Sequence, residues 1–520
     1  MPRQRASDAA ALILLSPSDL SQHQVWRVAL SRRREIPDTP IKLPCFRAPN
    51  GDSVGRACVE IGAKSFNKAL NMSESNAVGP VSGATEDRLQ RIERLNPRIN
   101  ALLTVTAEEA RRAARDLDAR DDWGGLLHGL LVSVKDNIEV AGVRTTWGSK
   151  TFQDYVSRQD AEVVARLRAS GAILLGKDNM AEFAYGGTSQ NEISAGVRNP
   201  WDLTRIPGGS SGGSGAAVAA GLCDAALGTD TAGSVRVPAS MCGVVGLRPT
   251  VGRVSNRGTF EDSVAFDTVG PLARTVSTVA RVFAAIAGHD PLDPGSIDRP
   301  VENFLSRLGD GIRGLRIGIP RKFYFEDLEK DVETRVLEAI RVFEAAGATM
   351  CDVIVPRAEE SHPRTSLCLL AADMADLHRD RMKNQPQLIG AEVLRRLEAG
   401  LPITAADYAQ SLRWLRDWRM DVCRLFDNVD MLLTPTTPLV APQIAASADM
   451  ISATRQLSRF TVGIGAAGFP AMSVPCGFDS DGLPVGMQLV AAHFAEPVLF
   501  RAGVEYQKRT DFHKRRPALE

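Results

Sequence analysis

Two turns rich in glycine and serine hold the residues of this chain best suited to nucleophilic chemistry. The first turn, Gly208 to Gly215, contains five glycines and three serines, and the second reads Thr231-Ala232-Gly233-Ser234. Glycine allows a backbone to approach a ligand closely, and successive N–H groups in such turns form concavities that hold anions. We single out Ser210 and Ser234, one from each turn and 24 residues apart.

The base that would activate a serine is not expected to be a histidine. None of the seven histidines lies within 75 residues before Ser210 or within 50 residues after Ser234. Lys135, in contrast, ends the apolar run Gly129 to Val134, where a buried strand would meet the rim of an active site. Burial disfavours the charged form of a lysine, so Lys135 is a candidate base for a serine nucleophile.

With these residues in place, the chain resembles the amidase signature hydrolases, a family whose catalytic triad is Ser–cis-Ser–Lys. The triad falls here on Lys135, Ser210 and Ser234, and the spacings of 75 and 24 residues fit the family. The resemblance covers roughly residues 86 to 515. Besides the glycine-rich block, it includes the segments GKDNMAEFAYGGTSQN, RNPWD, LLTPTTP, GFPAMSVPCG and GLPVGMQLVA.

The resemblance carries implications for fold and site. It implies an α/β fold, the amidase signature fold, in which one large mixed β-sheet is flanked on both faces by α-helices. It implies a cis peptide between Gly209 and Ser210. It also implies an oxyanion hole made by the backbone N–H groups of Thr231, Ala232, Gly233 and Ser234. The family usually has two glycines before the nucleophile, so Ala232 is a departure whose methyl group narrows the pocket or moves one N–H.

Four neighbours are expected to support the triad without reacting, namely Gly209, Ser211, Asp230 and Arg236. Asp230 and Arg236 flank Ser234, and we interpret them as a structural pair that holds the turn rather than as substrate ligands. Ser211 is interpreted as a loop former that can assist through a hydrogen bond.

Ser211 also belongs to an alternative motif. Residues Gly209 to Gly213 match the G-x-S-x-G pattern of an α/β-hydrolase elbow, with Ser211 as nucleophile. That motif requires a strand directly before it and a downstream Asp and His. Thr204 to Pro207 is a poor strand, because proline removes a donor from the ladder, so the elbow is disfavoured.

Composition excludes several classes of function. The 62 basic and 62 acidic residues balance, so neither nucleic acid nor an acidic membrane is an expected partner. The eight cysteines are scattered without a CxxC pair, which favours reduced, buried thiols in a cytoplasmic protein. Neither CxxC nor HExxH is present, so no metal or cofactor is expected. No apolar run approaches the ~18 residues of a membrane span.

The chain divides at about residue 86. Residues 1–85 form an N-terminal extension with no sustained periodicity, and residues 86–520 are expected to form one catalytic domain. Helices and strands alternate in that domain, which is typical of an α/β layered fold. The helix after residue 86 is expected to be interrupted at Asn96-Pro97. Further helices are predicted at 107–120, 160–170, 276–286, 331–346, 405–426 and 497–507. Besides the apolar strand that leads into Lys135, strands are predicted at 172–175, 315–319, 351–355, 430–433, 471–474 and 487–490.

The function expected from the resemblance is hydrolysis of a carboxylic amide, or of a related carbamate or urea, through an acyl-enzyme. The substrate would be a small molecule, and a homodimer is a further assembly to consider. Two alternatives stay open: the glutamine-amidase subunit of a tRNA-dependent amidotransferase, which shares the triad, and a non-catalytic scaffold that kept the fold.

Overall fold

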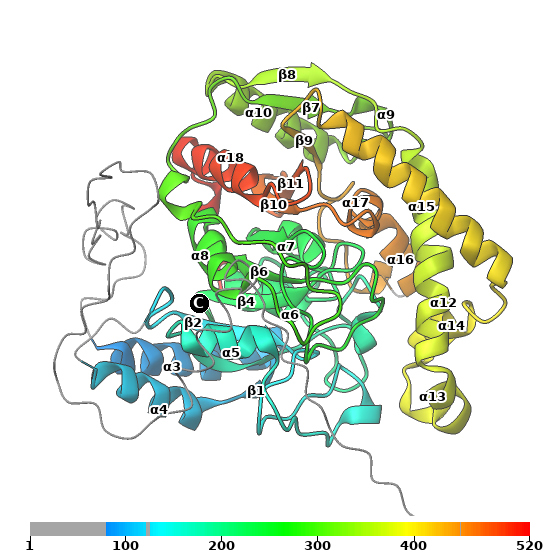
Figure 1. Cartoon of the computed structure of the whole chain (residues 1–520). Helices are drawn as coiled ribbons and strands as arrows, with labels where there is room; N and C mark the ends of the chain where they lie inside the picture. The colour runs from blue at the N-terminus through cyan, green and yellow to red at the C-terminus, as the bar shows by residue number, and fades with distance from the viewer. Residues whose placement is uncertain (1–79, 121–124, 448, 520) are drawn as a thin grey trace, which may run out of the picture. The chain divides into compact units, whose positions relative to one another are not determined.

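The computed structural model of the protein describes residues 80–120, 125–447 and 449–519. Within these residues eleven strands form one sheet (Figure 1). The strands are β1 (Leu102–Val105), β2 (Leu131–Lys135), β3 (Ile173–Asp178), β4 (Ala225–Thr229), β5 (Val245–Arg248), β6 (Val269–Ala273), β7 (Arg316–Ile319), β8 (Thr349–Asp352), β9 (Met431–Pro435), β10 (Ala471–Phe478) and β11 (Pro484–Ala491).

The sheet is mixed, with the strand order β1-β3-β2-β4-β6-β5-β10-β11-β9-β7-β8. Strands β3, β2 and β4 are parallel to one another, as are β9, β7 and β8. The neighbours from β4 through β6, β5, β10 and β11 to β9 pair antiparallel, and so do β1 and β3. Since β2 and β4 run in the same direction, their last residues, Lys135 and Thr229, reach the same edge of the sheet.

Helices cover both faces of this sheet (Figure 1). They are α3 (Val81–Ile99), α4 (Ala107–Asp118), α5 (Glu162–Ala169), α6 (Gly212–Ala219), α7 (Arg236–Cys242), α8 (Val276–Ile286), α9 (Arg321–Tyr324), α10 (Lys330–Ala345), α11 (Ser361–Arg364), α12 (Ala371–Leu377), α13 (Arg379–Asn384), α14 (Ala391–Glu398), α15 (Ala405–Leu425), α16 (Met450–Leu457), α17 (Val462–Ala466) and α18 (Glu496–Arg509).

Alternation along the strands explains the two layers, because successive side chains of a strand point to opposite faces. Val132 and Val134 of β2 join a core with α5, α8, α10 and α18. Leu131 of the same strand joins a second core with α3, α4, α6 and α7. A third core, with α14, α15 and α17, takes Ala471 of β10 and Val490 of β11. The expected amidase signature architecture, a large mixed sheet between helices, is confirmed.

Most predicted elements are present, with small shifts. The helix 276–286 has its predicted bounds, and α15 ends one residue before the predicted position 426. The expected interruption at Asn96-Pro97 is wrong, because α3 continues to Ile99 with Pro97 in its last turn, where the helix lacks only the bond that the missing N–H of Pro97 would make. The strand predicted at 351–355 begins and ends earlier, as β8.

The elements that the prediction missed include α6, β4, α7, β5 and β6, all between residues 212 and 273. Every residue of α6 and of β4 is buried, so neither element has the polar face that creates a period of 3.6 or 2. The boundary predicted between residues 85 and 86 falls inside α3. Residues 1–79 of the predicted extension lie outside the described part of the chain.

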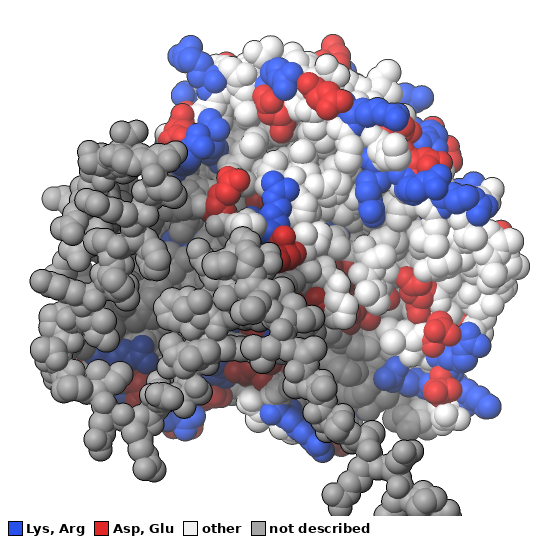
Figure 2. All heavy atoms as spheres, viewed as in Figure 1, with Lys and Arg blue, Asp and Glu red and all other residues white. Residues whose placement is uncertain are grey.

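Basic and acidic side chains are interspersed over the described surface visible in Figure 2. No large field of one sign is drawn there, which agrees with the balanced composition of the chain. Among the helices of residues 80–120, 125–447 and 449–519, none combines the length and the apolar character needed to cross a membrane.

Candidate active site

Lys135, the last residue of β2, has a fully buried side chain. Its Nζ atom lies 2.7 Å from Ser210 Oγ and 2.6 Å from Thr229 Oγ1. The Thr229 hydroxyl also accepts from Asn137 Nδ2 at 3.2 Å. Thr229 ends the neighbouring parallel strand, so the sheet itself places this hydroxyl beside the amine. No carboxylate of the described chain forms a salt bridge with Lys135, whose amine therefore sits between two hydroxyls.

Burial lowers the pKa of Lys135 to about 8, from an ordinary 10.5, because a charged amine is poorly solvated inside a protein. The nearby carboxyl groups of Asp262, Asp267 and Asp230 act in the opposite direction without cancelling the effect of burial. The lowered pKa means that the neutral amine, the form able to accept a proton, is populated in mildly alkaline solution.

Two other lysines near Lys135 in sequence have different environments. Lys177 is buried, but its Nζ lies 3.2 Å from Asp136 Oδ1 in an ion pair. Lys150 is partly exposed and lies 3.0 Å from Glu192 Oε2. Because both amines are paired with carboxylates, Lys135 alone of the three has only hydroxyl neighbours.

Backbone contacts bring the two serine turns together. The peptide bond Gly209–Ser210 is cis, as the family resemblance implies. The Ser210 carbonyl accepts from the N–H of Ala181 at 3.1 Å, and the N–H of Ser211 donates to the Ser234 carbonyl at 3.2 Å. The first turn is thereby fixed to the second immediately before α6 begins.

Ser211 is fully buried beside the end of β4. Its hydroxyl donates to the Thr229 carbonyl at 3.2 Å and accepts from the Thr229 N–H at 3.3 Å. Residues 204 to 210 contain no strand, so the strand that an elbow nucleophile needs is missing from this described segment. Ser211 therefore has a structural role, because its buried hydroxyl is bonded to the backbone and cannot reach a substrate.

Asp230 holds the second turn from its buried side. Its carboxylate accepts from the N–H groups of Gly233 at 2.9 Å, Val235 at 3.1 Å and Arg236 at 3.3 Å. Arg236 pairs with it at 2.8 Å and Arg248 at 3.2 Å, and all three side chains are fully buried. Burial alone would raise the pKa of Asp230, but Arg236, Arg248 and the N–H donors hold it well below the ordinary value.

Gly233 occupies the tightest position of the turn. Its φ is +133°, and an added Cβ would lie 2.2 Å from Thr461 Oγ1, so only glycine fits. The Thr461 hydroxyl donates to the Ala232 carbonyl at 2.6 Å. The N–H of Gly233 is already bonded to Asp230, whereas those of the other three residues of the turn donate to no described group. The four oxyanion donors expected from the sequence are thus reduced to three free candidates.

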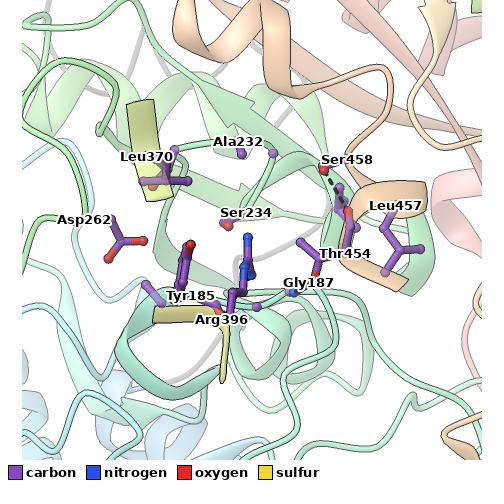
Figure 3. A pocket seen from close by; sticks show the side chains of 16 residues that line it. Tyr185, Gly187, Ala232, Ser234, Asp262, Leu370, Arg396, Thr454, Leu457 and Ser458 are labelled. Atoms are coloured by element: carbon purple, nitrogen blue, oxygen red, sulfur yellow. Dashed lines mark hydrogen bonds between the residues drawn. The ribbon is translucent and has the colours of Figure 1, made fainter. Parts of the chain in front are cut away.

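Ser234 borders a small space that we call the inner cavity, about 30 Å³ in volume (Figure 3). Within the described chain its hydroxyl makes no hydrogen bond, so the expected link to Ser210 is not formed in this arrangement. The residues that line this cavity include Tyr185, Ala232, Asp262, Leu370, Arg396 and Thr454. A substrate must displace some of these side chains, since the cavity holds one or two water molecules at most.

Sequence reasoning missed Thr229, Asp262 and Arg396. Thr229 had a weak signal, because it follows a run of small residues and directly precedes Asp230. Asp262 lies in the segment between β5 and β6, and Arg396 lies in α14. Nothing in the sequence indicated that these two, 134 residues apart by their numbering, border one cavity with Ser234.

The cysteines in the described range are free thiols. Cys223, Cys242 and Cys476 are buried as expected, whereas Cys423 is exposed and Cys351 and Cys368 are half-buried. Cys45 and Cys58 lie outside the described residues. In residues 80–120, 125–447 and 449–519, no group of three or more His, Cys, Asp or Glu side chains is arranged to hold a metal ion.

Several known proteins are similar to this chain in sequence and in fold. A family model described as Amidase matches residues 83–500, which include Lys135 and both serine turns. A glutamyl-tRNA(Gln) amidotransferase subunit of Moorella thermoacetica is 41% identical over 461 residues, covering 84% of this chain and 94% of that protein. The structure of 6-aminohexanoate cyclic dimer hydrolase gives a TM-score of 0.78 at 30% identity, covering 84% and 95% of the two chains. A chain from a vestigial protein complex tied to the origins of an s-triazine catabolic enzyme gives 0.79 at 37% identity, covering 83% and 96%.

The acid limb of the pH–rate profile should report Lys135. The amine must be neutral to accept a proton, so kcat/KM for an amide should rise as the pH increases through about 8 and then level off. Lys135→Arg should lower kcat/KM by roughly 100-fold or more, because a guanidinium stays protonated. The exposed Lys150→Arg is the matched control and should keep the wild-type limb. An unchanged profile in Lys135→Ala would contradict the assignment.

Thr229 should act as a positioning residue for Lys135. Thr229→Val keeps the shape of the side chain but removes the hydroxyl that holds Nζ, so kcat should fall roughly 10- to 100-fold with KM little changed. Thr229→Ser restores the hydroxyl and should recover most of the rate. Steady-state kinetics of the two variants check this. An active Thr229→Val beside an impaired Thr229→Ser would show that the methyl group, not the hydroxyl, matters, and equal losses would contradict the role of the hydroxyl.

Proposed function

The chain belongs to the amidase signature family, and from that premise we propose that it hydrolyses carboxylic amides through Lys135, Ser210 and Ser234. The enzymes of this family act on the C–N bonds of amides. The observation that carries the proposal is the 2.7 Å contact between Lys135 Nζ and Ser210 Oγ in a fully buried setting. A lysine in such a position has no evident structural task, because an apolar side chain would fill the space without the penalty of burying an amine.

In the proposed reaction a proton moves along the triad. Neutral Lys135 accepts the proton of the Ser210 hydroxyl, and Ser210 accepts the proton of Ser234 once that hydroxyl turns toward it. The Ser234 oxygen attacks the amide carbonyl and forms a C–O bond, and the carbonyl becomes an oxyanion. Ser210 then returns a proton to the leaving nitrogen as the C–N bond breaks. Water hydrolyses the resulting ester by the same route and releases the acid.

The oxyanion is assigned to the free N–H groups of Thr231, Ala232 and Ser234. Each donor that points at the developing charge contributes roughly 3 kcal/mol to the transition state. Gly233 is left out because Asp230 accepts its N–H. In this proposal Asp230 and Arg236 keep the structural role expected of them, since they fix the turn that presents the donors.

A serine-reactive phosphonate should label Ser234 and no other serine of the two turns. Ser234 borders the inner cavity, whereas Ser211 is fully buried. Peptide mapping after labelling identifies the modified residue. Ser234→Ala should abolish both labelling and amide hydrolysis while its melting temperature stays near that of the wild type. A label on Ser211 would contradict the proposal.

A second candidate is the glutamine-amidase subunit of an amidotransferase, which uses the same chemistry. The observation in its favour is the identity of 39–41% to glutamyl-tRNA(Gln) amidotransferase subunits of several organisms, over 84–88% of this chain. We favour a free amidase acting on a small-molecule amide in a reducing cytoplasm, as a monomer or a homodimer. The three buried thiols support the reducing compartment.

Ammonia release separates the two candidates. A free amidase should hydrolyse simple aliphatic or aryl amides by itself, with glutamine no better than other amides that carry an amino group. The amidotransferase component should release ammonia from glutamine and do so faster in the presence of its partner proteins. Purified enzyme assayed against both substrate sets, with Ser234→Ala as the blank, gives the answer. Activity confined to glutamine would favour the second candidate.

A further inference from the structure

Asp262 is a buried carboxyl group without a partner. The residue is 4% exposed, and its Oδ1 atom accepts no hydrogen bond from the described residues. It borders the inner cavity together with Ser234. Figure 3 shows the Asp262 carboxyl at one side of this space, across from Thr454 and Ser458, with Ser234 between them. A buried polar group is normally bonded, so an unpaired one at the edge of a cavity points to a ligand.

The segment around Asp262 is held rigidly. The N–H of Asp262 donates to Asp267 Oδ2 at 2.6 Å, and the next residue, Ser263, donates its hydroxyl to Asp373 Oδ2 at 2.6 Å. Tyr408 anchors Asp373 from the other side at 2.8 Å. Asp262 is therefore presented by a preformed segment, which reduces the ordering cost of binding a ligand.

No cation of the described chain neutralises Asp262 by direct contact. Arg396 borders the same cavity, but its guanidinium stacks on the Tyr185 ring at 3.7 Å and donates to the Tyr185 carbonyl at 3.1 Å. The amine of Lys135 donates to its two hydroxyl neighbours, not to Asp262. Burial and the adjacent Asp267 raise the pKa of Asp262 well above its ordinary value, and the positive charges of Lys135 and Arg396 act in the opposite direction without cancelling this.

Asp262 also borders a second, larger space, which we call the outer vestibule, with a volume of about 720 Å³. The charged residues of the vestibule are Glu261, Asp262, Asp373, Asp376 and Arg379. Its single arginine is paired with Asp376 at 2.9 Å, which leaves an excess of carboxyl groups. Asp262 is common to the vestibule and the inner cavity. A cleft lined by one sign of charge attracts ligands of the other sign.

We propose that Asp262 is a specificity-determining residue that binds a positively charged amino group of the substrate while Ser234 attacks the amide. The preferred substrates are then amides that also carry a primary or secondary amine. The ammonium group provides the partner that Asp262 lacks, and the acidic vestibule guides it there. This inference rests on the proposed function, since it assumes that Ser234 is the nucleophile in the inner cavity.

Labelling rates test the inference without a known substrate. Two fluorophosphonates are compared, one with an alkyl chain that ends in an ammonium group and one in which a methyl group replaces the ammonium. Wild-type enzyme should be labelled at Ser234 faster by the ammonium probe, by roughly 10- to 100-fold, the range for a hydrogen bond between charged groups. In Asp262→Asn the two rates should become nearly equal, because the variant has no carboxylate to bind the ammonium group.

The matched control is Glu261→Gln. Glu261 precedes Asp262 and lines the vestibule but not the inner cavity, and its Oε1 atom accepts from Asn256 Nδ2 at 2.9 Å. Because Glu261 does not border the inner cavity, the ratio of the two rates should fall far less than in Asp262→Asn. An ω-amino amide and its methyl isostere should show the same preference in kcat/KM. Melting temperatures confirm that the variants fold, and the wild-type ratio tests the inference without any variant.

Several outcomes would overturn the inference. Equal rates for the two probes in the wild type would do so, as would a preference that survives Asp262→Asn. Faster labelling by a probe ending in a carboxylate would assign recognition to Arg396 instead. If neither probe labels Ser234, the proposed function itself fails, and the inference falls with it.

Discussion

The site depends on an amine buried where it is poorly solvated as a cation. Lys135 ends β2 between the hydroxyls of Ser210 and Thr229 and has no salt-bridge partner in the described chain. Because its pKa in the folded protein lies below the ordinary value, the unfolded chain binds a proton that the folded chain has lost. The free energy of unfolding contributed by this group therefore increases with pH between about 8 and 10.5. Below about pH 8 the lysine is charged in both the folded and the unfolded chain. The free-energy cost of burying that charge then no longer changes with pH, and the rest of the core must offset it.

A second buried network fixes the turn that faces this amine. Asp230 gathers three N–H groups and two guanidinium groups, a set that satisfies a buried charge fully. The same carboxylate decides which N–H groups of the turn stay free, because it takes that of Gly233 and leaves its neighbours. Asp230 thus both supports the turn and determines which of its N–H groups are available to an oxyanion. A substitution at Asp230 would affect both.

Sequence reasoning succeeded where a residue type is tied to a local backbone requirement. The glycine-rich turns, the lysine at the end of an apolar run and the amphipathic helices α8 and α15 all have such signatures. It failed for α6 and β4, whose residues are buried on every side and carry no periodicity. It also failed for Asp262 and Arg396, because the tertiary fold alone brings them to one cavity. Thr229 lies between these cases, since its place at a strand end is local but its contact with Lys135 depends on the pairing of β2 with β4.

The triad and part of the cavity wall come from different stretches of the chain. Lys135, Ser210 and Ser234 lie within one hundred residues, on the sheet and its adjoining turns, whereas Leu370, Arg396, Thr454 and Ser458 lie far downstream. Substitutions among these downstream residues would change the shape of the substrate pocket and leave Lys135, Ser210 and Ser234 in place. Such a division lets substrate preference change through substitutions in α14, in α16 and around Leu370, while the reactive groups stay the same.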